Sequence, residues 1–164
     1  MINIELTSKR GDFVLYEDDE PILNLKRSDW HSANAITTYL GLNLVIEATN
    51  IWKTKFDILE NDHCIGTIKV SRSSGIEIML LGQNYEKHNY TLRRKGLLKP
   101  KFDLYASNHR HILTMLSSFN WSYFNFDYTI KEKTDLPEDL DIYELLMYCT
   151  YAANLYLKKK GWRG

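Results

Sequence analysis

The sequence has little cysteine and no excess of charge of either sign. Its 164 residues include two cysteines, Cys64 and Cys149, and 21 basic residues against 21 acidic ones. This is too few cysteines for the disulfide framework of a small secreted domain, and we expect both to remain thiols. Because the net charge is zero, no overall positive field favours nucleic acid, and any anion site must be local.

A secretion signal and the common catalytic motifs are also missing. Residues 1–13 alternate like a strand and lack the basic start and apolar core of a signal peptide, so we expect a cytoplasmic protein. No Gly-rich phosphate loop, G-x-S-x-G turn or Cys-x-x-Cys pair occurs. We therefore expect no cofactor, no metal site and no catalytic activity.

Three weaker patterns fit ordinary structural roles. His109 and His111 could face one side of a strand as metal ligands, but no third ligand with matching spacing is visible. His63 and Cys64 are neighbours, so in a strand they would face opposite sides, which excludes a thiol and base pair. The acidic run over residues 17–20 fits a charged hairpin tip that ends at Pro21.

One long segment near the end of the chain is apolar on all sides. Between residues 142 and 157, Glu144, Thr150 and Asn154 are the clearly polar residues, and a helix that is apolar all round is buried. This apolar part of 16 residues is roughly 24 Å long. A bilayer span needs about 20 residues with few polar interruptions, so we expect no transmembrane span.

The boundaries of this helix have their own signals. Asp135 is expected to cap the first turn, with Glu138 completing a capping box and Pro137 in the tolerated first turn. Lysines at 158–160 followed by Gly161 mark the other end. We expect a central helix over about residues 137–160.

The first 130 residues repeat one pattern three times. Strands that begin at Phe13, Phe56 and Phe102 lie 43 and then 46 residues apart. Each is followed by a polar turn and two further strands, and each is preceded by a strand about 12 residues upstream. Around these three, we expect strands at 2–6, 22–26, 35–39, 44–47, 64–69, 76–80, 90–93, 111–116 and 122–126. The units cover about residues 1–40, 43–82 and 89–130.

Twelve short strands with period-two alternation predict a barrel or a sandwich. A barrel of twelve strands leaves a lumen that its own side chains do not fill, and a helix about 10 to 12 Å across fits that space. We therefore expect a mainly β fold: a closed barrel of roughly twelve antiparallel strands around a buried central C-terminal helix. Residues 1–164 would form a single domain.

Two strand motifs and the segment before the helix resemble a known family. Residues 52–57 (WKTKFD) and 98–103 (LKPKFD) share a pattern, and residues 137–142 (PEDLDI) lead into the apolar helix. With the three four-stranded units, they resemble the Tubby C-terminal-like superfamily. That group includes phospholipid scramblases, plant LURP-one-related proteins and the Tubby phosphoinositide-binding domain. The resemblance covers nearly the whole chain and implies a twelve-stranded barrel around a central C-terminal helix.

The resemblance does not extend to the features with which scramblases work. Their calcium is held by acidic residues before the helix, and here that stretch contains Asp127, Glu132 and Asp135 among lysines. They also carry a cysteine-rich palmitoylated stretch and a membrane-inserted helix, whereas this helix contains Glu144 and Asn154. We therefore do not expect lipid scrambling.

Tubby domains bind phosphoinositide head groups with basic side chains on the barrel exterior. If Phe56 and Phe102 point inward, strand alternation sends the lysines of the two motifs outward. The alternative is a mixed solvated surface beside Asp57 and Asp103, which contributes little energy. The candidate anion- or lipid-binding residues are Lys53, Lys55, Lys99, Lys101, Arg93 and Arg94.

Residues 121–128 (WSYFNFDY) place aromatic side chains on both faces of one expected strand. One of these faces must look outward. It forms either an exposed ridge for a protein partner or a surface covered by a neighbouring loop.

Together these features predict a non-catalytic binding or scaffold domain. Its partner would be an anionic lipid head group or a protein, bound through the barrel exterior. The alternatives are a small-molecule carrier of the lipocalin kind, which needs an empty lumen, a scramblase-related membrane-associated protein, and an enzyme. An enzyme needs a cleft where titratable residues with perturbed pKa values converge. The sequence does not specify the oligomeric state, and we expect a monomer.

Overall fold

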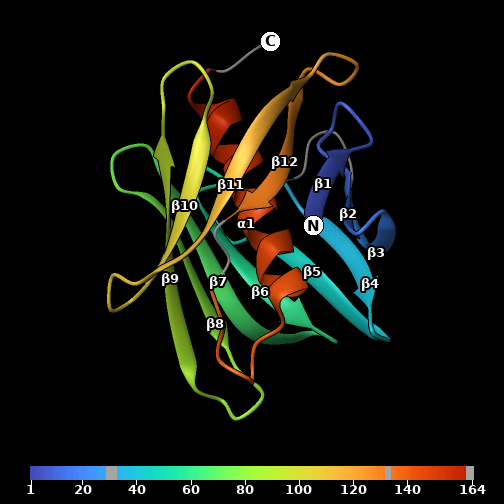
Figure 1. The fold of residues 1–164 in the computed structure, drawn as a ribbon. Helices are drawn as coiled ribbons and strands as arrows, with labels where there is room; N and C mark the ends of the chain where they lie inside the picture. Colours follow the sequence, from blue (N-terminus) through green and yellow to red (C-terminus); the bar gives the residue numbers. More distant parts are fainter. Residues whose placement is uncertain (29–32, 132–133, 162–164) are drawn as a thin grey trace.

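Twelve antiparallel strands form a closed barrel around one helix (Figure 1). In this computed structural model, residues 1–28, 33–131 and 134–161 are described. Each strand pairs with the next along the chain and β12 pairs with β1, so the sheet has no free edge. The expected fold class is confirmed. The elements are β1 (Ile2–Leu6), β2 (Phe13–Glu17), β3 (Glu20–Arg27), β4 (Ala35–Tyr39), β5 (Leu42–Ala48), β6 (Lys55–Glu60), β7 (His63–Ser71), β8 (Gly75–Leu81), β9 (Lys87–Lys95), β10 (Lys101–Ala106), β11 (His111–Asn120), β12 (Asn125–Lys131) and α1 (Ile142–Lys159).

The three phenylalanine-led strands, β2, β6 and β10, are built alike. Phe13, Phe56 and Phe102 all point into the core and are at most 1% exposed. Each of these strands shifts register against the following strand at the same relative position, next to Leu15, Ile58 and Leu104. A bulge bends its strand and increases the local twist. Three equivalent bulges therefore help to curve the sheet until it closes.

Helix α1 fills the barrel. Residues 145–157 are all buried, and the helix packs against β3, β7, β8 and β12. Leu146, Tyr148 and Ala152 have no exposed surface, as the sequence predicts for a central helix. The helix therefore occupies the lumen that a lipocalin-type carrier needs. Within the described ranges, no helix is both long enough and apolar enough to traverse a bilayer.

The three polar residues of the helix have partners inside the barrel. Thr150 Oγ1 donates to the Leu146 carbonyl at 2.8 Å, and Tyr148 donates its hydroxyl to Glu144 Oε1 at 2.8 Å. Asn154 Oδ1 accepts from the Tyr128 hydroxyl, also at 2.8 Å. A buried polar group without a partner is destabilising, so these bonds make polar residues tolerable in a core helix.

The helix begins at Ile142, later than the expected residue 137, and its N-cap is Asp141 rather than Asp135. Asp141 Oδ1 accepts from the backbone N–H groups of Tyr143 at 2.8 Å and Glu144 at 3.1 Å. The preceding residues bind elsewhere, because the Asp139 carbonyl accepts from the backbone N–H of the β8–β9 connection. That contact keeps the segment against the barrel wall and out of the helix.

The expected strand over residues 122–126 is also corrected. Strand β11 continues to Asn120, residues 121–124 form a turn, and β12 starts at Asn125. Asn120 Oδ1 accepts from the backbone N–H of Ser122 at 3.1 Å and of Tyr123 at 3.3 Å, which is how an asparagine side chain initiates a turn. The aromatic residues therefore do not form a ridge along one strand.

Candidate functional site

The two ends of the barrel carry opposite charge. Since the strands alternate in direction, the connections β1–β2, β3–β4, β5–β6, β7–β8, β9–β10 and β11–β12 lie at the end where α1 finishes. We call this the basic end and the other the acidic end. Described connections at the basic end contain Lys9, Arg10, Lys53, Arg72 and Lys99, with Asp12 as their one carboxylate. Those at the acidic end contain Asp18, Asp19, Asp62, Glu86, Asp135, Glu138, Asp139 and Asp141, with Arg110 as their one arginine or lysine.

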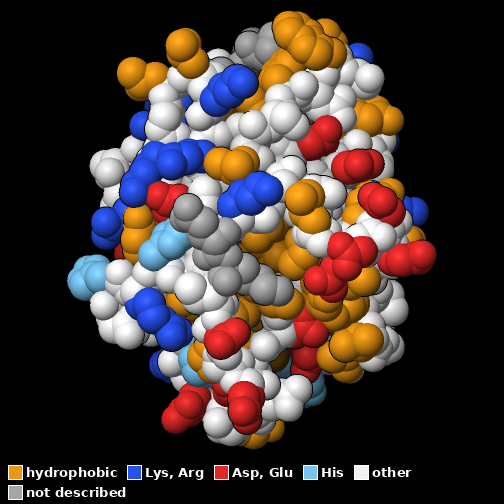
Figure 2. All heavy atoms as spheres, in the orientation of Figure 1, with side chains coloured by type: hydrophobic (Ala, Val, Ile, Leu, Met, Phe, Trp, Pro, Cys, Tyr) orange, Lys and Arg blue, Asp and Glu red, His pale blue; other side chains and the backbone are white. Residues whose placement is uncertain are grey.

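The face shown in Figure 2 displays this sorting. Lysine and arginine side chains gather over its upper left part, and aspartate and glutamate side chains gather at the bottom and on the right. Apolar side chains protrude along the upper edge, which is the basic end. A chain with a net charge of zero thus presents two surfaces with different binding properties.

Lys53 and Lys55 lie beside a basic hollow at this end, which we call the β7–β8 hollow. It has a volume of about 400 Å³. Lys53 is in the turn before β6, and Lys55 is the first residue of that strand. The hollow is also lined by the acidic residue Glu77, which lies opposite Lys69 in the register of β7 and β8. The basic residues that line the hollow are Lys55, Lys69, Arg72 and Lys159.

The environment of Lys159 shows that positive charges are concentrated in this hollow. Its Nζ donates to the Trp52 carbonyl at 2.9 Å. Burial, and then the positive charges of Arg72 and Lys53, lower the pKa of Lys159 below its ordinary value. An anion bound among these side chains would reduce the repulsion between them, so the arrangement favours a phosphate or carboxylate group.

Lys99 and Lys101 are not part of this hollow. Strands β6 and β10 are separated by β7, β8 and β9, which places the two motifs roughly 15 to 20 Å apart at the ordinary strand spacing. Lys99 is in the β9–β10 connection, and Lys101 is the first residue of β10. The six candidate residues therefore belong to two separate regions rather than to one face.

Arg93 and Arg94 differ in orientation. Arg93 is exposed, and its guanidinium lies over the ring of Tyr105 at 5.5 Å. Arg94 shares the inward-facing side of β9 with Leu92, pairs with Phe102 and donates to the Leu97 carbonyl at 3.3 Å. Of the two arginines, Arg93 is the one available to a ligand on the outer wall.

The largest departure from the expected solvated surface is at Asp103. Its side chain points outward from β10 yet is 7% exposed, and it binds Lys95 Nζ at 2.8 Å. Thr114 Oγ1 also donates to it at 2.8 Å, and this hydroxyl oxygen can accept from His111 Nε2, which lies at 3.0 Å. Burial alone would raise the pKa of Asp103, but the bonds from Lys95 and Thr114 outweigh burial and lower it.

This network holds a lysine and a carboxylate in a close ion pair on the outer wall. The hydrogen bond to Asp103 raises the pKa of Lys95 above its ordinary value, so the lysine is held as an ammonium ion. Four cavities in the described part of the chain, of about 250, 290, 400 and 620 Å³, are lined by other residues. The ion pair and the Thr114 hydrogen bond link β10 to its neighbours β9 and β11 on the outer wall.

A second basic cavity, of about 250 Å³, lies at the basic end. It is between the last turns of α1 and the β1–β2 and β11–β12 connections. Lys9 Nζ lies over the Phe124 ring at 5.7 Å. Asn154 is 9% exposed, and its Nδ2 atom has no hydrogen-bond partner among the described residues. The charged residues that line this second basic cavity are Lys9, Arg10, Arg27 and Lys158.

Large apolar side chains protrude from the same connections. They are between 52% and 90% exposed, although side chains of this kind are usually covered. Leu40 and Tyr85 are the comparable residues in the described connections at the acidic end. The protruding residues at the basic end are Ile51, Trp52, Leu97, Leu98, Trp121 and Phe124.

At the acidic end, a cavity of about 620 Å³ lies beside the start of α1. Glu144 is in its lining, and burial, followed by the negative charges of Asp141 and Glu60, raises the pKa of this residue. Tyr39 donates its hydroxyl to Asp141 Oδ2 at 2.9 Å. Of the acidic run expected before the helix, Glu132 and the adjacent Lys133 lie outside the described residues.

Several of these residues were not identified from the sequence. Lys69 and Arg72 are three residues apart, but Lys159 is far from both in the chain, and the three become neighbours only in the fold, which sequence spacing does not reveal. The connections could have provided a signal, because alternate connections of an up-and-down barrel share an end. Glu86, His88 and Asp139, which converge at the acidic end, carried no recognisable motif.

Comparisons with known proteins support the fold. No protein-family model and no curated protein matches the chain. A similar solved structure is the X-ray structure of the protein AT5G01750 from Arabidopsis thaliana, with a TM-score of 0.56 and 14% sequence identity. The match covers 94% of this chain and 90% of the plant chain. At this identity, the likeness shows a common fold alone.

Proposed function

We propose that this chain is a member of the Tubby C-terminal-like superfamily and acts as a non-catalytic binding module for anionic phospholipid surfaces. The membership is supported by the closed twelve-stranded barrel, the central helix and the similarity to the plant structure. The proposed activity rests on one observation. Exposed apolar loop tips and basic cavities occur together at one end of the barrel.

The apolar tips suit a membrane interface. Trp52 and Trp121 are more than 70% exposed, and tryptophan is a side chain that partitions to the boundary between head groups and acyl chains. Leu97 and Leu98 form the third tip. Shallow insertion of such side chains contributes apolar burial, and nearby lysines and arginines add attraction to anionic lipids.

The basic cavities would hold the phosphate groups. In the β7–β8 hollow, Lys55, Lys69, Arg72 and Lys159 form no ion pair with a carboxylate in the described part of the chain. Each lysine or arginine near an anionic surface contributes about 1 kcal/mol. The acidic end would face away from the surface, so the charge distribution also orients the approach.

Sedimentation with vesicles tests the proposal. Vesicles of phosphatidylcholine alone are compared with vesicles that also contain phosphatidylserine and phosphoinositide. A Lys55→Glu/Arg72→Glu variant should bind the anionic vesicles at least about 30-fold more weakly, since two favourable charges worth about 1 kcal/mol each are lost. The matched control, Lys87→Glu/Arg110→Glu, makes the same change in net charge at the acidic end and should bind like the unmodified chain.

A tip variant separates insertion from charge. Trp52→Ser/Leu98→Ser should weaken binding at all salt concentrations, whereas the loss caused by Lys55→Glu/Arg72→Glu should shrink as salt screens the charges. If the unmodified chain does not sediment with anionic vesicles, the proposed lipid-binding function is wrong. Equal losses in the basic-end variant and its acidic-end control would show that net charge alone matters, and would also overturn the proposed site.

A further inference from the structure

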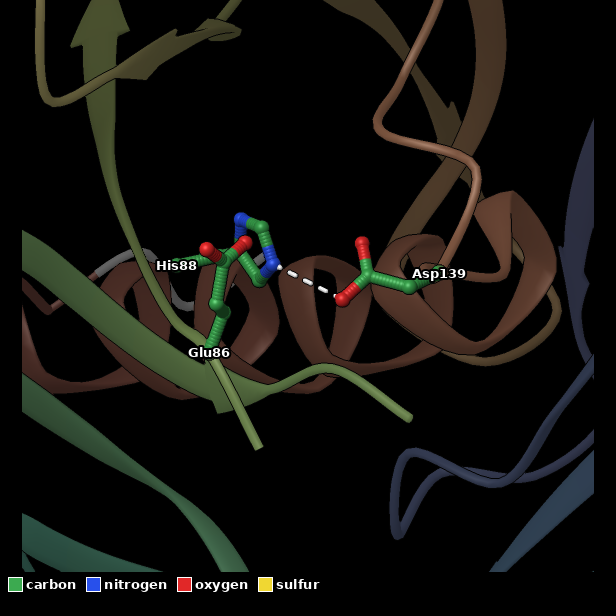
Figure 3. A group of neighbouring side chains, drawn as sticks. All are labelled: Glu86, His88 and Asp139. Carbon is green, nitrogen blue, oxygen red and sulfur yellow. Dashed lines mark hydrogen bonds and ion pairs between the residues drawn. The ribbon is translucent and has the colours of Figure 1, made fainter. Parts of the chain in front are cut away.

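Glu86, His88 and Asp139 converge at the acidic end of the barrel (Figure 3). Glu86 precedes β9, His88 is its second residue, and Asp139 lies before the start of α1. Each offers one potential ligand atom, and the three atoms lie within 4.8 Å of one another. His88 Nε2 and Asp139 Oδ2 are 3.2 Å apart.

The backbone on both sides of this cluster is held in place. Glu86 and His88 are two residues apart and so share a face, and Figure 3 shows their side chains together with Asp139 directed toward the imidazole. The Glu86 carbonyl accepts from the Gly82 N–H at 2.9 Å, and its N–H donates to Asn84 Oδ1 at 3.2 Å. On the other side, the Asp139 carbonyl accepts from the Gln83 N–H at 3.4 Å. These bonds hold the backbone of Glu86 and of Asp139 in place.

Gly82 makes room for this arrangement. A Cβ atom at this position would lie 1.7 Å from Asp139 Oδ2 and 3.1 Å from His88 Nε2. No side chain fits there unless the aspartate moves away. The close approach of Asp139 to His88 thus depends on a glycine in the β8–β9 connection, which also carries Glu86.

The donor set indicates which ligand would fit. We infer that Glu86, His88 and Asp139 form a binding site for a divalent transition metal ion of the zinc class. In a tetrahedral zinc site with bonds of about 2.0 to 2.1 Å, neighbouring ligand atoms are about 3.4 Å apart, close to the separation of the His88 and Asp139 atoms. The ligand atom of Glu86 lies within 4.8 Å of the other two. Because Glu86 is exposed, its side chain can turn to shorten these distances to about 3.4 Å.

The mixture of one imidazole nitrogen and two carboxylate oxygens selects among metals. Calcium and magnesium prefer sites made entirely of oxygen, whereas zinc, cobalt and nickel accept imidazole readily. Three protein ligands leave a fourth position open to water or to a small ligand. Asp139 also lines the 620 Å³ cavity at this end, so that position would lie at the edge of the cavity.

A direct binding experiment tests this site. The untagged full chain, freed of metal by a chelator, is titrated calorimetrically with zinc chloride, and cobalt chloride provides a visible absorption spectrum. We expect one ion per chain. His88→Ala should abolish binding, and Glu86→Gln should weaken it by at least about tenfold. Glu138→Gln, which removes an exposed carboxylate next to Asp139, is the matched control and should bind as tightly as the unmodified chain.

Two further variants test the geometry of the site and the identity of its ligands. Gly82→Ala removes no donor but displaces Asp139, so it should also weaken zinc binding about tenfold or more, while far-UV circular dichroism checks that the barrel is intact. Cys64→Ser should have no effect, and the cobalt complex should lack a thiolate charge-transfer band.

Three outcomes would overturn the inference. They are no zinc binding by the unmodified chain, binding that survives His88→Ala, and binding that follows Cys64. If His88 and Asp139 serve only as an ion pair that ties the segment before α1 to β9, the first outcome is the one observed. The vesicle experiment concerns the opposite end of the barrel, so its result does not decide this one.

Discussion

The basic end and the acidic end are built from the same kind of connection but present different chemistry. At the basic end, cations surround two cavities and apolar tips protrude. At the acidic end, carboxylates surround one larger cavity and the start of α1. The composition, with its net charge of zero, gives no sign of this difference. Charge balance over a whole chain therefore says little about the charge of its surfaces.

Topology produces this polarity. In an up-and-down barrel every second connection reaches the same end, so the lysines and arginines of β1–β2, β5–β6, β7–β8 and β9–β10 gather at one end, and the carboxylates of β2–β3, β6–β7 and β8–β9 gather at the other. The helix adds to the sorting, because Asp141 and Glu144 lie at its start and Lys158 and Lys159 lie in its last turn. Those charges also complement the helix dipole. One pattern thus serves both helix stability and surface chemistry.

The largest effects are expected in the helix that joins the two ends. Leu146 has no exposed surface, and Leu146→Ala should lower the free energy of unfolding by about 2 to 5 kcal/mol. Leu155 already borders the 250 Å³ cavity at the basic end, so Leu155→Ala should cost less, nearer about 2 kcal/mol. Urea unfolding followed by circular dichroism measures both.

Urea unfolding followed by fluorescence as well as circular dichroism tests whether the two ends unfold together. Trp52 and Trp121 are at the basic end, so in a chain whose other two tryptophans, Trp30 and Trp162, are changed to Phe, fluorescence follows that end, whereas circular dichroism follows the whole barrel. Coincident transitions indicate one cooperative unit. A fluorescence transition that comes earlier would show that the basic end opens separately, and a larger cost for Leu155→Ala than for Leu146→Ala would contradict the burial argument.

A smaller effect is expected at the buried carboxylate nearer the basic end. Asp103→Asn should lower stability at neutral pH by about 2 kcal/mol, because charged hydrogen bonds from Lys95 and Thr114 are lost or weakened. Asp57 has the equivalent place in β6 and is less buried. Asp57→Asn is therefore the control, and it should change stability by less than about 0.5 kcal/mol.

The pH dependence of this effect has a definite sign. The folded-state pKa of Asp103 is lowered from its ordinary value of 3.8, so its contribution is complete above that value and is lost as the pH falls through the folded pKa. Urea midpoints measured from neutral pH downward should therefore converge for Asp103→Asn and the unmodified chain. Curves that stay parallel into the acid range would show that the charge of Asp103 is not responsible.

Much of the fold could be predicted from the sequence because its signals are local. The anchor residues Phe13, Phe56 and Phe102, the strand alternation and the all-round apolar helix each follow from neighbouring residues. The start of the helix was predicted wrongly, with Asp135 as the N-cap, because Asp135 and Asp141 both suit an N-cap. The choice between them depends on the contact of Asp139 with the β8–β9 connection.

The candidate site was harder to predict for a related reason. The lysines of the two motifs, Lys53, Lys55, Lys99 and Lys101, were expected to face outward, but whether they share one site depends on the strand order, which separates the motifs. The burial of Asp103 depends on Lys95 and Thr114, which come from the strands on either side. Equal motifs therefore became unequal environments, with Asp57 less buried and Asp103 buried.

The smallest effect, of opposite sign, is expected at the acidic end. Burial and the charges of Asp141 and Glu60 raise the pKa of Glu144 above its ordinary value of 4.5, so its ionised form destabilises the fold as the pH rises through the folded pKa. Glu144→Gln keeps an acceptor for the Tyr148 hydroxyl and removes that charge. It should stabilise the protein at neutral pH by about 0.5 to 1 kcal/mol.

The gain from Glu144→Gln is limited because the helix dipole favours a negative charge in the first turn. Its urea midpoint should exceed that of the unmodified chain by a margin that grows as the pH rises above 4.5 and through the folded-state pKa of Glu144, whereas Asp103→Asn should lie below the unmodified chain at neutral pH. Glu138→Gln removes an exposed carboxylate from the same end and should show neither trend. If Glu144→Gln proved destabilising at neutral pH, the ionised carboxylate of Glu144 would stabilise the fold. Buried carboxylates would then contribute stability at both ends, as Asp103 is expected to do nearer the basic end.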